Sequence, residues 1–166
     1  MIAYLGLGSN LGHSLNYLKN AFYALQQHRA IDLMAHSSIY QSKPQGPQDQ
    51  ADYLNAVVQI ETSLSAQQLL DATQAIEAKN LRQRTGQRWG ARTLDIDILL
   101  FGEQCIGTKT LSIPHPYLCQ RSFVLWPLND IITELNFPNG KTLQTCLAAC
   151  SADDLHKTAL SFTRNA

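Results

Sequence analysis

The order of the predicted strands and helices constrains the fold more than any other feature of this chain. Hydrophobic periodicity predicts strands at residues 2–8, 31–40, 53–62 and 93–101. It also predicts one helix that ends near Gln27 and a second that opens at the capping box Ser65-x-x-Gln68. Because the second and third strands follow each other directly, the order is β-α-β-β-α-β. That order is typical of an α+β fold of the ferredoxin-like class, with helices packed on one face of the sheet.

The size and charge of the chain narrow the possible functions. A length of 166 residues indicates a single domain, residues 1–166. Thirteen Lys and Arg residues balance thirteen Asp and Glu residues, and this zero net charge argues against a protein that mainly coats nucleic acid or an acidic membrane. Hydrophobic residues make up 45% of the chain, which is enough to form a core and argues against disorder.

The sequence shows no signal for export or membrane insertion. The N-terminal segment MIAYLGLGSNLG has no positively charged region, and no run approaches the ~18 apolar residues of a membrane span. We therefore expect a cytoplasmic protein. The four cysteines include no C-x-x-C pair, so they are predicted to be reduced and structural.

Two aspartates on the predicted strand 93–101 are the strongest candidates for chemistry. Asp95 and Asp97 stand two residues apart, so their carboxylates project from one face of the strand. The opposite face is predicted to be apolar and buried, through Leu94, Ile96, Ile98 and Leu100. Two carboxylates in this arrangement can bind or bridge Mg²⁺ ions that hold phosphate oxygens. The alternative is an acidic strand face exposed to solvent.

Arginines crowd the loop just before this strand. Four of the chain's seven arginines fall within residues 80–92: Arg82, Arg84, Arg88 and Arg92. Guanidinium groups match phosphate oxygens, so beside the aspartates this loop is predicted to clamp an anion rather than to be merely solvated. Trp89 is predicted either to cover a base or ring or to anchor the loop on the core. His115, between two prolines, is able to hydrogen-bond a phosphate, although a lone loop histidine is more often only a surface residue.

The remaining segments give weaker signals. Gly6-x-Gly8 followed by Gly12 resembles a dinucleotide-binding fingerprint, but the glycine spacing differs from that motif, and a tight turn is the better interpretation. No P-loop motif occurs. Residues 43–51 are predicted to form a binding loop, 110–113 a short strand, 121–128 part of the core and 142–150 a last helix.

Taken together, these segments resemble the 6-hydroxymethyl-7,8-dihydropterin pyrophosphokinase family of folate biosynthesis. The resemblance covers about residues 2 to 135 and rests on short motifs in the family's order and spacing: Gly6-Leu-Gly-Ser-Asn10, Tyr40-x-Ser42-x-Pro44-x-Gly46, Tyr53-Leu-Asn55-Ala, Arg88-Trp-Gly-Ala-Arg92-Thr-Leu-Asp95-Ile-Asp97, Ile113-Pro-His115-Pro and Arg121-Ser-Phe123-Val-Leu-Trp-Pro-Leu128. Lys43 and Gln45 depart from it, because both are more polar than is usual in the family's pterin loop.

This resemblance implies an enzyme with a three-layer α/β/α fold. It implies transfer of the β,γ-pyrophosphoryl group of ATP to the hydroxymethyl group of the pterin, with release of AMP. It also implies two Mg²⁺ ions as cofactors and a product that passes to dihydropteroate synthase. It further implies a monomer that binds neither nucleic acid nor a membrane.

The same resemblance implies roles for residues at matching positions. Asp95 and Asp97 would hold Mg²⁺, and together with Arg82 and Arg92 they would be the catalytic residues. The residues at the family's nucleotide site are Gln74, Glu77, Arg84, Trp89, Arg92, Ile98, Ser112, His115 and Arg121. The residues at its pterin site are Ser42, Pro44, Gly46, Tyr53, Asn55 and Phe123. Loops 43–51 and 82–92 would then close over the substrates and exclude water.

Two other kinds of function stay open on the sequence alone. Ferredoxin-like sheets also occur in RNA-binding modules, and RQRTGQRWGAR mixes arginines with an aromatic residue. The carboxylates of Asp95 and Asp97 argue against this, because they would repel an RNA backbone. A metal-dependent nuclease or a simple kinase would use the same acidic pair, and the identity of the products separates both from pyrophosphoryl transfer.

Overall fold

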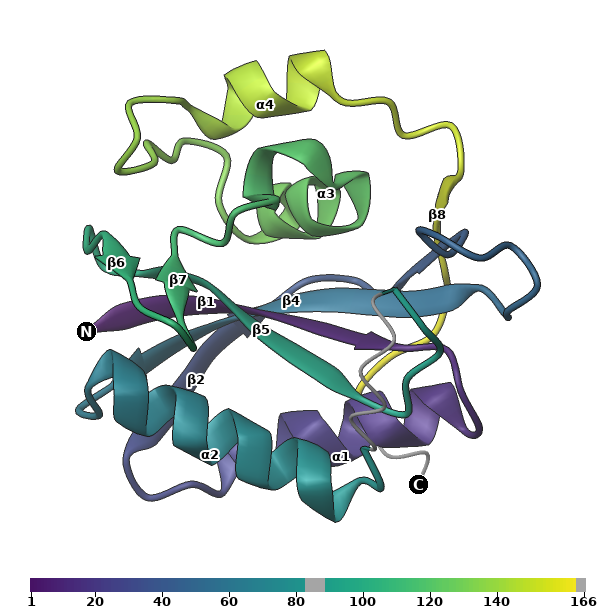
Figure 1. Cartoon of the computed structure of the whole chain (residues 1–166), viewed down its shortest axis with the longest axis horizontal. Coiled ribbons are helices and arrows are strands. Elements are labelled where there is room, and N and C mark those ends of the chain that lie inside the picture. The colour runs from purple at the N-terminus through teal and green to yellow at the C-terminus, as the bar shows by residue number, and fades with distance from the viewer. Residues whose placement is uncertain (83–88, 164–166) are drawn as a thin grey trace.

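An antiparallel sheet forms the middle layer of the protein (Figure 1). The computed structural model describes residues 1–82 and 89–163. Within them the sheet has the strand order β5-β1-β4-β3-β8, and β2 also pairs with β4. The strands are β1 Ile2–Ser9, β2 Ile31–His36, β3 Tyr40–Ser42, β4 Tyr53–Thr62, β5 Asp95–Phe101 and β8 Leu155–Lys157. The predicted α+β class and the ferredoxin-like order of the core are confirmed.

Two pairs of helices cover the two faces of this sheet. The α1–α2 layer consists of α1 (Ser14–Gln26) and α2 (Ala66–Lys79), and the α3–α4 layer consists of α3 (Ser122–Ile131) and α4 (Leu143–Ala149) (Figure 1). The predicted capping box opens α2: the Ser65 side chain accepts a hydrogen bond from the Gln68 N–H, and the Gln68 side chain accepts one from the Ser65 N–H. The three-layer α/β/α arrangement expected from the resemblance is therefore present.

Each helical layer buries its own apolar cluster against the sheet. Alternate residues of β4 divide between the two clusters, as predicted. Ala56, Val58 and Ile60 pack in the α1–α2 layer, and Val57 packs in the α3–α4 layer. The sheet is thus covered by an apolar cluster on each of its two faces.

β5 follows the predicted alternation only in its first half. Ile96 and Ile98 pack in the α1–α2 layer, so the two aspartates of the strand point to the other face. Leu100, which was predicted to share the face of Ile98, packs instead in the α3–α4 layer. The reason is a β-bulge: the pairing of β1 with β5 shifts between Tyr4 and Leu5, and the extra residue on β5 reverses the alternation beyond it.

The single strand predicted at residues 31–40 is in fact two strands. β2 ends at His36, β3 begins at Tyr40, and both pair with β4. Between them the Ser37 hydroxyl accepts a hydrogen bond from the Val57 N–H at 2.9 Å. A side-chain oxygen thus replaces a backbone oxygen as the acceptor, and the regular ladder is interrupted.

Other elements carry no clear periodicity. The segment 121–128, predicted only as core, lies largely within helix α3, whose internal Pro127 obscures the helical pattern. The predicted strand at 110–113 contains β7 (Ser112–Ile113), which pairs with β6 (Ile106–Gly107). Neither β6 nor β8 was predicted, because strands of two or three residues are too short to show alternation.

Candidate active site

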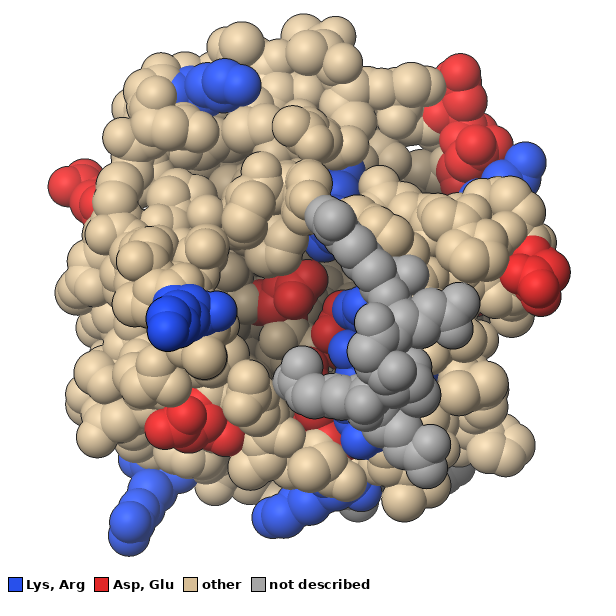
Figure 2. Space-filling model, in the orientation of Figure 1, with Lys and Arg blue, Asp and Glu red and all other residues tan. Residues whose placement is uncertain are grey.

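A cleft of about 200 Å³ opens on the α3 side of the sheet. Strands β1, β4 and β5 supply its floor, and α3 with the connection from β7 supplies one wall. Figure 2 shows acidic and basic side chains gathered in this hollow. Six of the residues predicted for the nucleotide and metal line it together, namely Trp89, Arg92, Asp95, Asp97, His115 and Arg121.

Two glycines keep the floor of the cleft open. Gly8 of β1 lies between Asp95 of β5 and Asn55 of β4, and Gly6 lies beside Asp97 in the same register. A Cβ atom at Gly8 would lie 3.2 Å from the Asn55 Oδ1. Gly6 and Gly8 lie within β1, inside the strand predicted at residues 2–8, and the chain turns only after it, around Gly12, which has φ +75°. Since Gly6 and Gly8 carry no side chain, β1 leaves a bare strip between the aspartates and Asn55.

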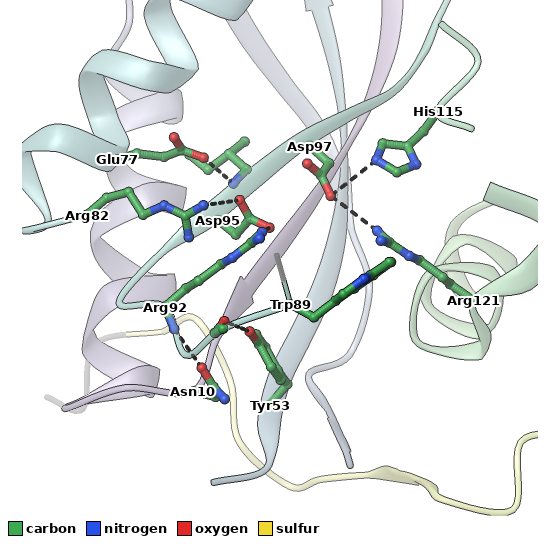
Figure 3. A network of polar contacts seen from close by, with 12 residues as sticks. Asn10, Tyr53, Glu77, Arg82, Trp89, Arg92, Asp95, Asp97, His115 and Arg121 are labelled. Carbon is green, nitrogen blue, oxygen red and sulfur yellow. Dashed lines mark hydrogen bonds and ion pairs between the residues drawn. The ribbon is translucent and has the colours of Figure 1, made fainter. Parts of the chain in front are cut away.

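Asp95 is compensated by two arginines (Figure 3). The Arg92 Nη1 donates to Asp95 Oδ2 at 2.6 Å, and the Arg82 Nη2 lies 3.5 Å from Oδ1. Only 8% of the Arg82 side chain is exposed. Burial lowers the pKa of Arg92, but the charge of Asp95 and its hydrogen bond outweigh burial and raise that pKa above its usual value. The Arg92 guanidinium is therefore held in its charged form beside Asp95.

Asp97 is compensated less closely (Figure 3). Its Oδ2 lies 3.6 Å from both His115 Nε2 and Arg121 Nη1, and 33% of its side chain is exposed. Burial, and then repulsion by Asp95, raise the pKa of Asp97 to about 7 even though Arg121 opposes the shift. The carboxylate faces the cleft, and Arg121, its cationic partner, lies beyond the distance of a close hydrogen bond.

His115 is a neutral neighbour of Asp97. Burial, and then the charge of Arg121, lower the pKa of His115 to about 4, so the imidazole is uncharged at pH 7. Its Nδ1 accepts a hydrogen bond from the Tyr117 N–H at 3.2 Å, which places the ring proton on Nε2. A neutral Nε2–H facing the cleft is a hydrogen-bond donor for an anionic ligand.

Aromatic rings surround the guanidinium of Arg121. Its Cζ lies 5.1 Å from the ring centroid of Trp89, 5.0 Å from that of Tyr117 and 5.6 Å from that of Phe123. Its Nε–H is buried and has no hydrogen-bond partner within the described part of the chain. Cation–π contacts thus hold the cation and leave a donor for an acceptor such as a phosphate oxygen. Tyr117 was not among the predicted site residues. Its only sequence signal is its position directly after Pro114-His115-Pro116.

Hydrogen bonds fix the end of the arginine loop to the strands. The Asn10 N–H donates to the Arg92 carbonyl at 3.0 Å, and the Arg92 N–H donates to Asn10 Oδ1 at 2.8 Å. Gln50 extends this link, because its Nε2 donates to the Trp89 carbonyl at 2.9 Å and its Oε1 accepts from Asn10 Nδ2. Asn10 stands in a motif of the resemblance and Gln50 in the predicted loop 43–51, but these hydrogen bonds were not predicted, since side-chain amides leave no periodic signal.

On the β4 side of Gly6 and Gly8, two aromatic rings and an amide line the cleft. The buried Asn55 donates its Nδ2 to Ser42 Oγ at 2.7 Å. Tyr53 and Phe123 also line the cleft. The Tyr53 hydroxyl donates to the Gly90 carbonyl at 3.0 Å, and burial raises the pKa of this tyrosine, so the hydroxyl stays protonated. Two aromatic rings beside an amide suit a flat ligand edged with donors and acceptors.

Some residues predicted for the site do not line this cleft. Gln74 is exposed on α2, Ser112 is exposed in β7, and Ile98 is buried in the α1–α2 layer. Pro44 and Gly46 lie in the loop after β3, outside the lining of the cleft. Alternation places Ile98 on the face opposite the aspartates, so its burial in the core follows from the strand itself.

Two further predicted residues have a different status. Glu77 is buried on α2, and its Oε1 accepts a hydrogen bond from the Ile96 N–H at 2.8 Å. It therefore connects α2 to the strand that carries both aspartates. Arg84 lies among residues 83–88, outside the described residues, and so does Arg88.

The donor atoms of the cleft suit a hard cation. No group of three or more His, Cys, Asp or Glu side chains placed to hold a metal occurs in residues 1–82 and 89–163. Mg²⁺ is commonly bound by only one or two carboxylates, with substrate phosphates and water completing its octahedron. Asp95 and Asp97 fit that pattern, and they do not fit a structural zinc site.

The cysteines and the helices lie outside the lining of the cleft, with the exception of the first turn of α3. All four cysteines are free, as predicted, although Cys105 is exposed and so is not a core residue. In the part of the chain that is described, no helix has the length and apolar character needed to cross a membrane. The cytoplasmic location and the monomeric state stay predictions.

Comparison with known proteins finds relatives over most of the chain. The family model described as 7,8-dihydro-6-hydroxymethylpterin-pyrophosphokinase (HPPK) matches residues 4–133. The chain is 48% identical over 141 residues to the 2-amino-4-hydroxy-6-hydroxymethyldihydropteridine pyrophosphokinase of Haemophilus influenzae, which covers 85% of this chain and 88% of that protein. It is 42% identical over 154 residues to the protein of the same name from Pseudomonas aeruginosa, which covers 93% and 94%.

Solved structures share the fold. The chain superposes on wild-type Plasmodium falciparum HPPK-DHPS with a TM-score of 0.68 at 15% identity. It superposes on an HPPK-DHPS complexed with substrates with a TM-score of 0.70 at 17% identity. In each case 89% of this chain is covered, and it spans 44% of the longer chain. At this level of identity the likeness shows the fold alone.

Proposed function

The chain belongs to the 7,8-dihydro-6-hydroxymethylpterin-pyrophosphokinase family, and we propose that Asp95 and Asp97 hold the magnesium that accompanies its ATP substrate. The enzyme transfers the β,γ-pyrophosphoryl group of ATP to the hydroxymethyl group of 6-hydroxymethyl-7,8-dihydropterin and releases AMP, a step of folate biosynthesis. In this reaction the cleft has three tasks: to bind the cation, the polyphosphate and the pterin.

The two aspartates have the properties of magnesium ligands. Both carboxylates face the cleft, and burial with repulsion by Asp95 raises the pKa of Asp97, so a cation bound beside it would relieve an unfavourable charge. We propose two ions, because the Cα atoms of alternate strand residues lie roughly 6–7 Å apart and phosphate oxygens can bridge the interval. When bound, Mg²⁺ neutralises charge on the phosphate oxygens of the group that is transferred.

The basic residues would bind the polyphosphate. Arg82 and Arg92 lie on the Asp95 side, and His115 and Arg121 lie on the Asp97 side. Carboxylates and rings hold these side chains in place before a substrate arrives, so binding costs less conformational entropy than it would for free arginines. The buried Nε–H of Arg121 supplies a donor aimed at no other group in the described chain.

The pterin would lie on the β4 side of Gly6 and Gly8, away from the two aspartates. Asn55 presents a carbonyl oxygen toward the cleft, and Tyr53 and Phe123 provide faces for stacking. Trp89 and the loop after β3 would close over the ring and keep water from the reacting groups.

One observation carries this assignment. Gly8 of β1 lies between Asp95 of β5 and Asn55 of β4, and β5 and β4 pair with opposite edges of β1. Strands two places apart are roughly 10 Å from each other. A bicyclic ring held at Asn55 can extend its hydroxymethyl arm over the glycine strip toward a phosphate held at the aspartates.

Calorimetric titration tests the metal site. Asp95→Asn and Asp97→Asn should weaken binding of magnesium with a non-hydrolysable ATP analogue by at least about 10-fold, because each removes a charged oxygen ligand. The control is Asp32→Asn, which changes an exposed carboxylate on β2 and should bind as the wild type does. Unchanged binding by Asp97→Asn would mean that Asp97 is not a ligand.

Product analysis tests the reaction itself. Phosphorus NMR of the protein with ATP, magnesium and the pterin should show AMP and a pterin diphosphate. ADP as the nucleotide product would instead indicate a simple kinase. Salt-dependent RNA binding without nucleotide binding would indicate the RNA-binding alternative.

We further propose that residues 1–166 act as one domain, as a monomer in the cytoplasm, and that the product passes to dihydropteroate synthase. The HPPK-DHPS structures, in which this fold forms part of a longer chain, support the transfer of product. Light scattering of the purified protein tests the monomer, which requires a mass close to 18.5 kDa.

A further inference from the structure

The last described residues of the chain wrap around one edge of the sheet. After α4 ends, residues 151–163, which we name the C-terminal strap, pass from the α3–α4 layer along β3 to α1 on the opposite face (Figure 1). The strap lies beyond the residues that match the family model. Its path therefore calls for a separate explanation.

The middle of the strap supports β3. There β8 pairs with β3, with Leu155 opposite Ser42. Thr158 donates both its N–H and its hydroxyl to the Ile39 carbonyl, at 2.9 and 2.7 Å. β3 has only three residues and pairs with β4 on its other side. So short a strand depends on both neighbours for its position, and the strap is the outer one.

β3 leads directly into the pterin pocket proposed above. Ser42, its last residue, is buried and accepts the hydrogen bond from Asn55 Nδ2. The next residue, Lys43, lines the cleft, and its Nζ lies 3.3 Å from Asp154 Oδ1 of the strap. The strap thus contacts two consecutive residues of the pocket wall from outside.

The end of the strap is anchored on the other side of the sheet. Phe162 is 2% exposed and belongs to the α1–α2 cluster. Its ring stacks on Phe22 of α1 with centroids 4.5 Å apart, and its carbonyl accepts a hydrogen bond from the Tyr23 hydroxyl at 2.8 Å. Phe162 lies on the sheet face opposite the cleft, so any effect on a substrate must pass through the strap.

We propose that Phe162 is a positioning residue for pterin binding. By anchoring the strap on α1 it holds β8 against β3, and so keeps Ser42 in place to orient Asn55. The proposal rests on the assignment of the pterin pocket. Loosening the anchor weakens pterin binding, whereas Asp95 and Asp97 lie on β5, which pairs with neither β3 nor β8, so the ATP side of the cleft is unaffected.

Steady-state kinetics of the full-length enzyme test this, with Phe162→Ala as the variant. The KM for the pterin should rise about 10-fold, while kcat and the KM for ATP stay within about twofold. Leu160→Ala is the matched control, because Leu160 is 40% exposed on the same strap, and its kinetics should equal those of the wild type. Phe162→Leu should restore most of the pterin affinity, since it refills most of the buried volume.

Hydrogen exchange gives a second measurement. In Phe162→Ala the amides of β3 should exchange faster than in the wild type, whereas those of β5 should not change. Equal rises in both KM values, or unchanged KM values in a folded variant, overturn the proposal. If Phe162→Ala does not fold, Thr158→Val carries the same test, because it removes the hydroxyl that donates to the Ile39 carbonyl and accepts from the Leu160 N–H, and keeps the Thr158 N–H bond to Ile39. A rise in the pterin KM alone supports the proposal, and no rise refutes it.

Asn55→Ala separates the two ways in which the idea can fail. An unchanged pterin KM in that variant would show that the pocket itself is misassigned, and the proposal would fall with it. A raised pterin KM in Asn55→Ala with an unchanged one in Phe162→Ala would refute the role of the strap alone.

Discussion

The two aspartates of β5 share one strand face and one cleft, but their surroundings differ. Asp95 receives a 2.6 Å hydrogen bond from Arg92 and a second contact from Arg82, whereas the basic neighbours of Asp97 lie 3.6 Å away. The exposed fraction of the side chain is 20% for Asp95 and 33% for Asp97. The site is therefore asymmetric: Asp95 has two arginine partners, one of them in a close hydrogen bond, whereas Asp97 has one arginine and a neutral imidazole, both at 3.6 Å. A cation that enters the cleft gains most at Asp97.

The origin of this asymmetry is the neighbouring structure. Asp95, at the start of β5, meets the end of α2 and the arginine loop that is tied to Asn10. Asp97 meets Arg121, but the rings around that guanidinium also attract it. Since the cation is shared between rings and carboxylate, it compensates Asp97 only in part.

The largest expected effect treats the two aspartates alike. Asp95→Asn and Asp97→Asn should each lower kcat by at least ~10²-fold, because each removes charge stabilisation from the transferred group. Rates of AMP formation at saturating ATP and pterin measure this, and Asp32→Asn again serves as the control. A near-normal rate in either variant would exclude that aspartate from the catalytic machinery.

The second prediction is that substitution of the two aspartates changes the free energy of unfolding in opposite directions. In EDTA at pH 8, Asp95→Asn should lower the free energy of unfolding by about 3 kcal/mol, because it leaves the buried Arg82 with a weaker partner. Asp97→Asn should raise that free energy, because it removes a carboxylate whose raised pKa shows that its charge is unfavourable in the folded state. Urea unfolding measures both. If the free energy of unfolding changed in the same direction in both variants, the different surroundings of the two aspartates would have no energetic consequence.

The pH dependence of stability sharpens the comparison further. Folding raises the pKa of Asp97 from 3.8 to about 7, so this group favours the folded state at low pH and that contribution is lost as pH rises through about 7. Folding lowers the pKa of His115 from 6.5 to about 4, so its contribution is present above pH 6.5 and is lost as pH falls. Between about pH 4 and 6.5 the two effects oppose each other in the metal-free wild type.

Single substitutions should expose each effect. Relative to the wild type in EDTA, the Tm of His115→Gln should fall as pH rises from 4 to 7, and the Tm of Asp97→Asn should rise over the same range, each by several degrees. Thermal unfolding monitored by circular dichroism measures these slopes. Parallel slopes in the two variants would refute the assigned shifts. Added Mg²⁺ should flatten the His115→Gln profile, since the cation compensates Asp97.

The sequence predicted what depends on residues close together in the chain. Alternation along β5 placed Asp95 and Asp97 on one face, and the capping box located the start of α2. The asymmetry between the aspartates could not be predicted in this way, because it depends on the tertiary placement of His115 and Arg121 and on the distances they reach. Spacing in a sequence reports neither.

Other parts of the fold escaped prediction for local reasons. The hydroxyl of Ser37 divides a strand, the bulge in β5 moves Leu100 to the other face, and Pro127 obscures helix α3. Gly6 and Gly8 lay inside the predicted strand 2–8, but the open strand face that they leave was not predicted, although a spacing of two glycines on an apolar strand is the pattern of such a face.

The smallest expected effect uses those two glycines, which lie beside the two aspartates. Alanine at Gly8 would place its Cβ 3.2 Å from Asn55 Oδ1, so the amide must shift by a few tenths of an ångström, and the pterin KM should rise about threefold. Alanine at Gly6 would meet only the Leu99 side chain at 3.5 Å, an ordinary contact beside Asp97, so its pterin KM should stay within about 1.5-fold. Steady-state kinetics with the pterin as the varied substrate compare the two variants directly. A larger pterin effect in Gly6→Ala than in Gly8→Ala would place the ring beside Asp97 rather than at Asn55, and the division of the cleft would have to be reversed.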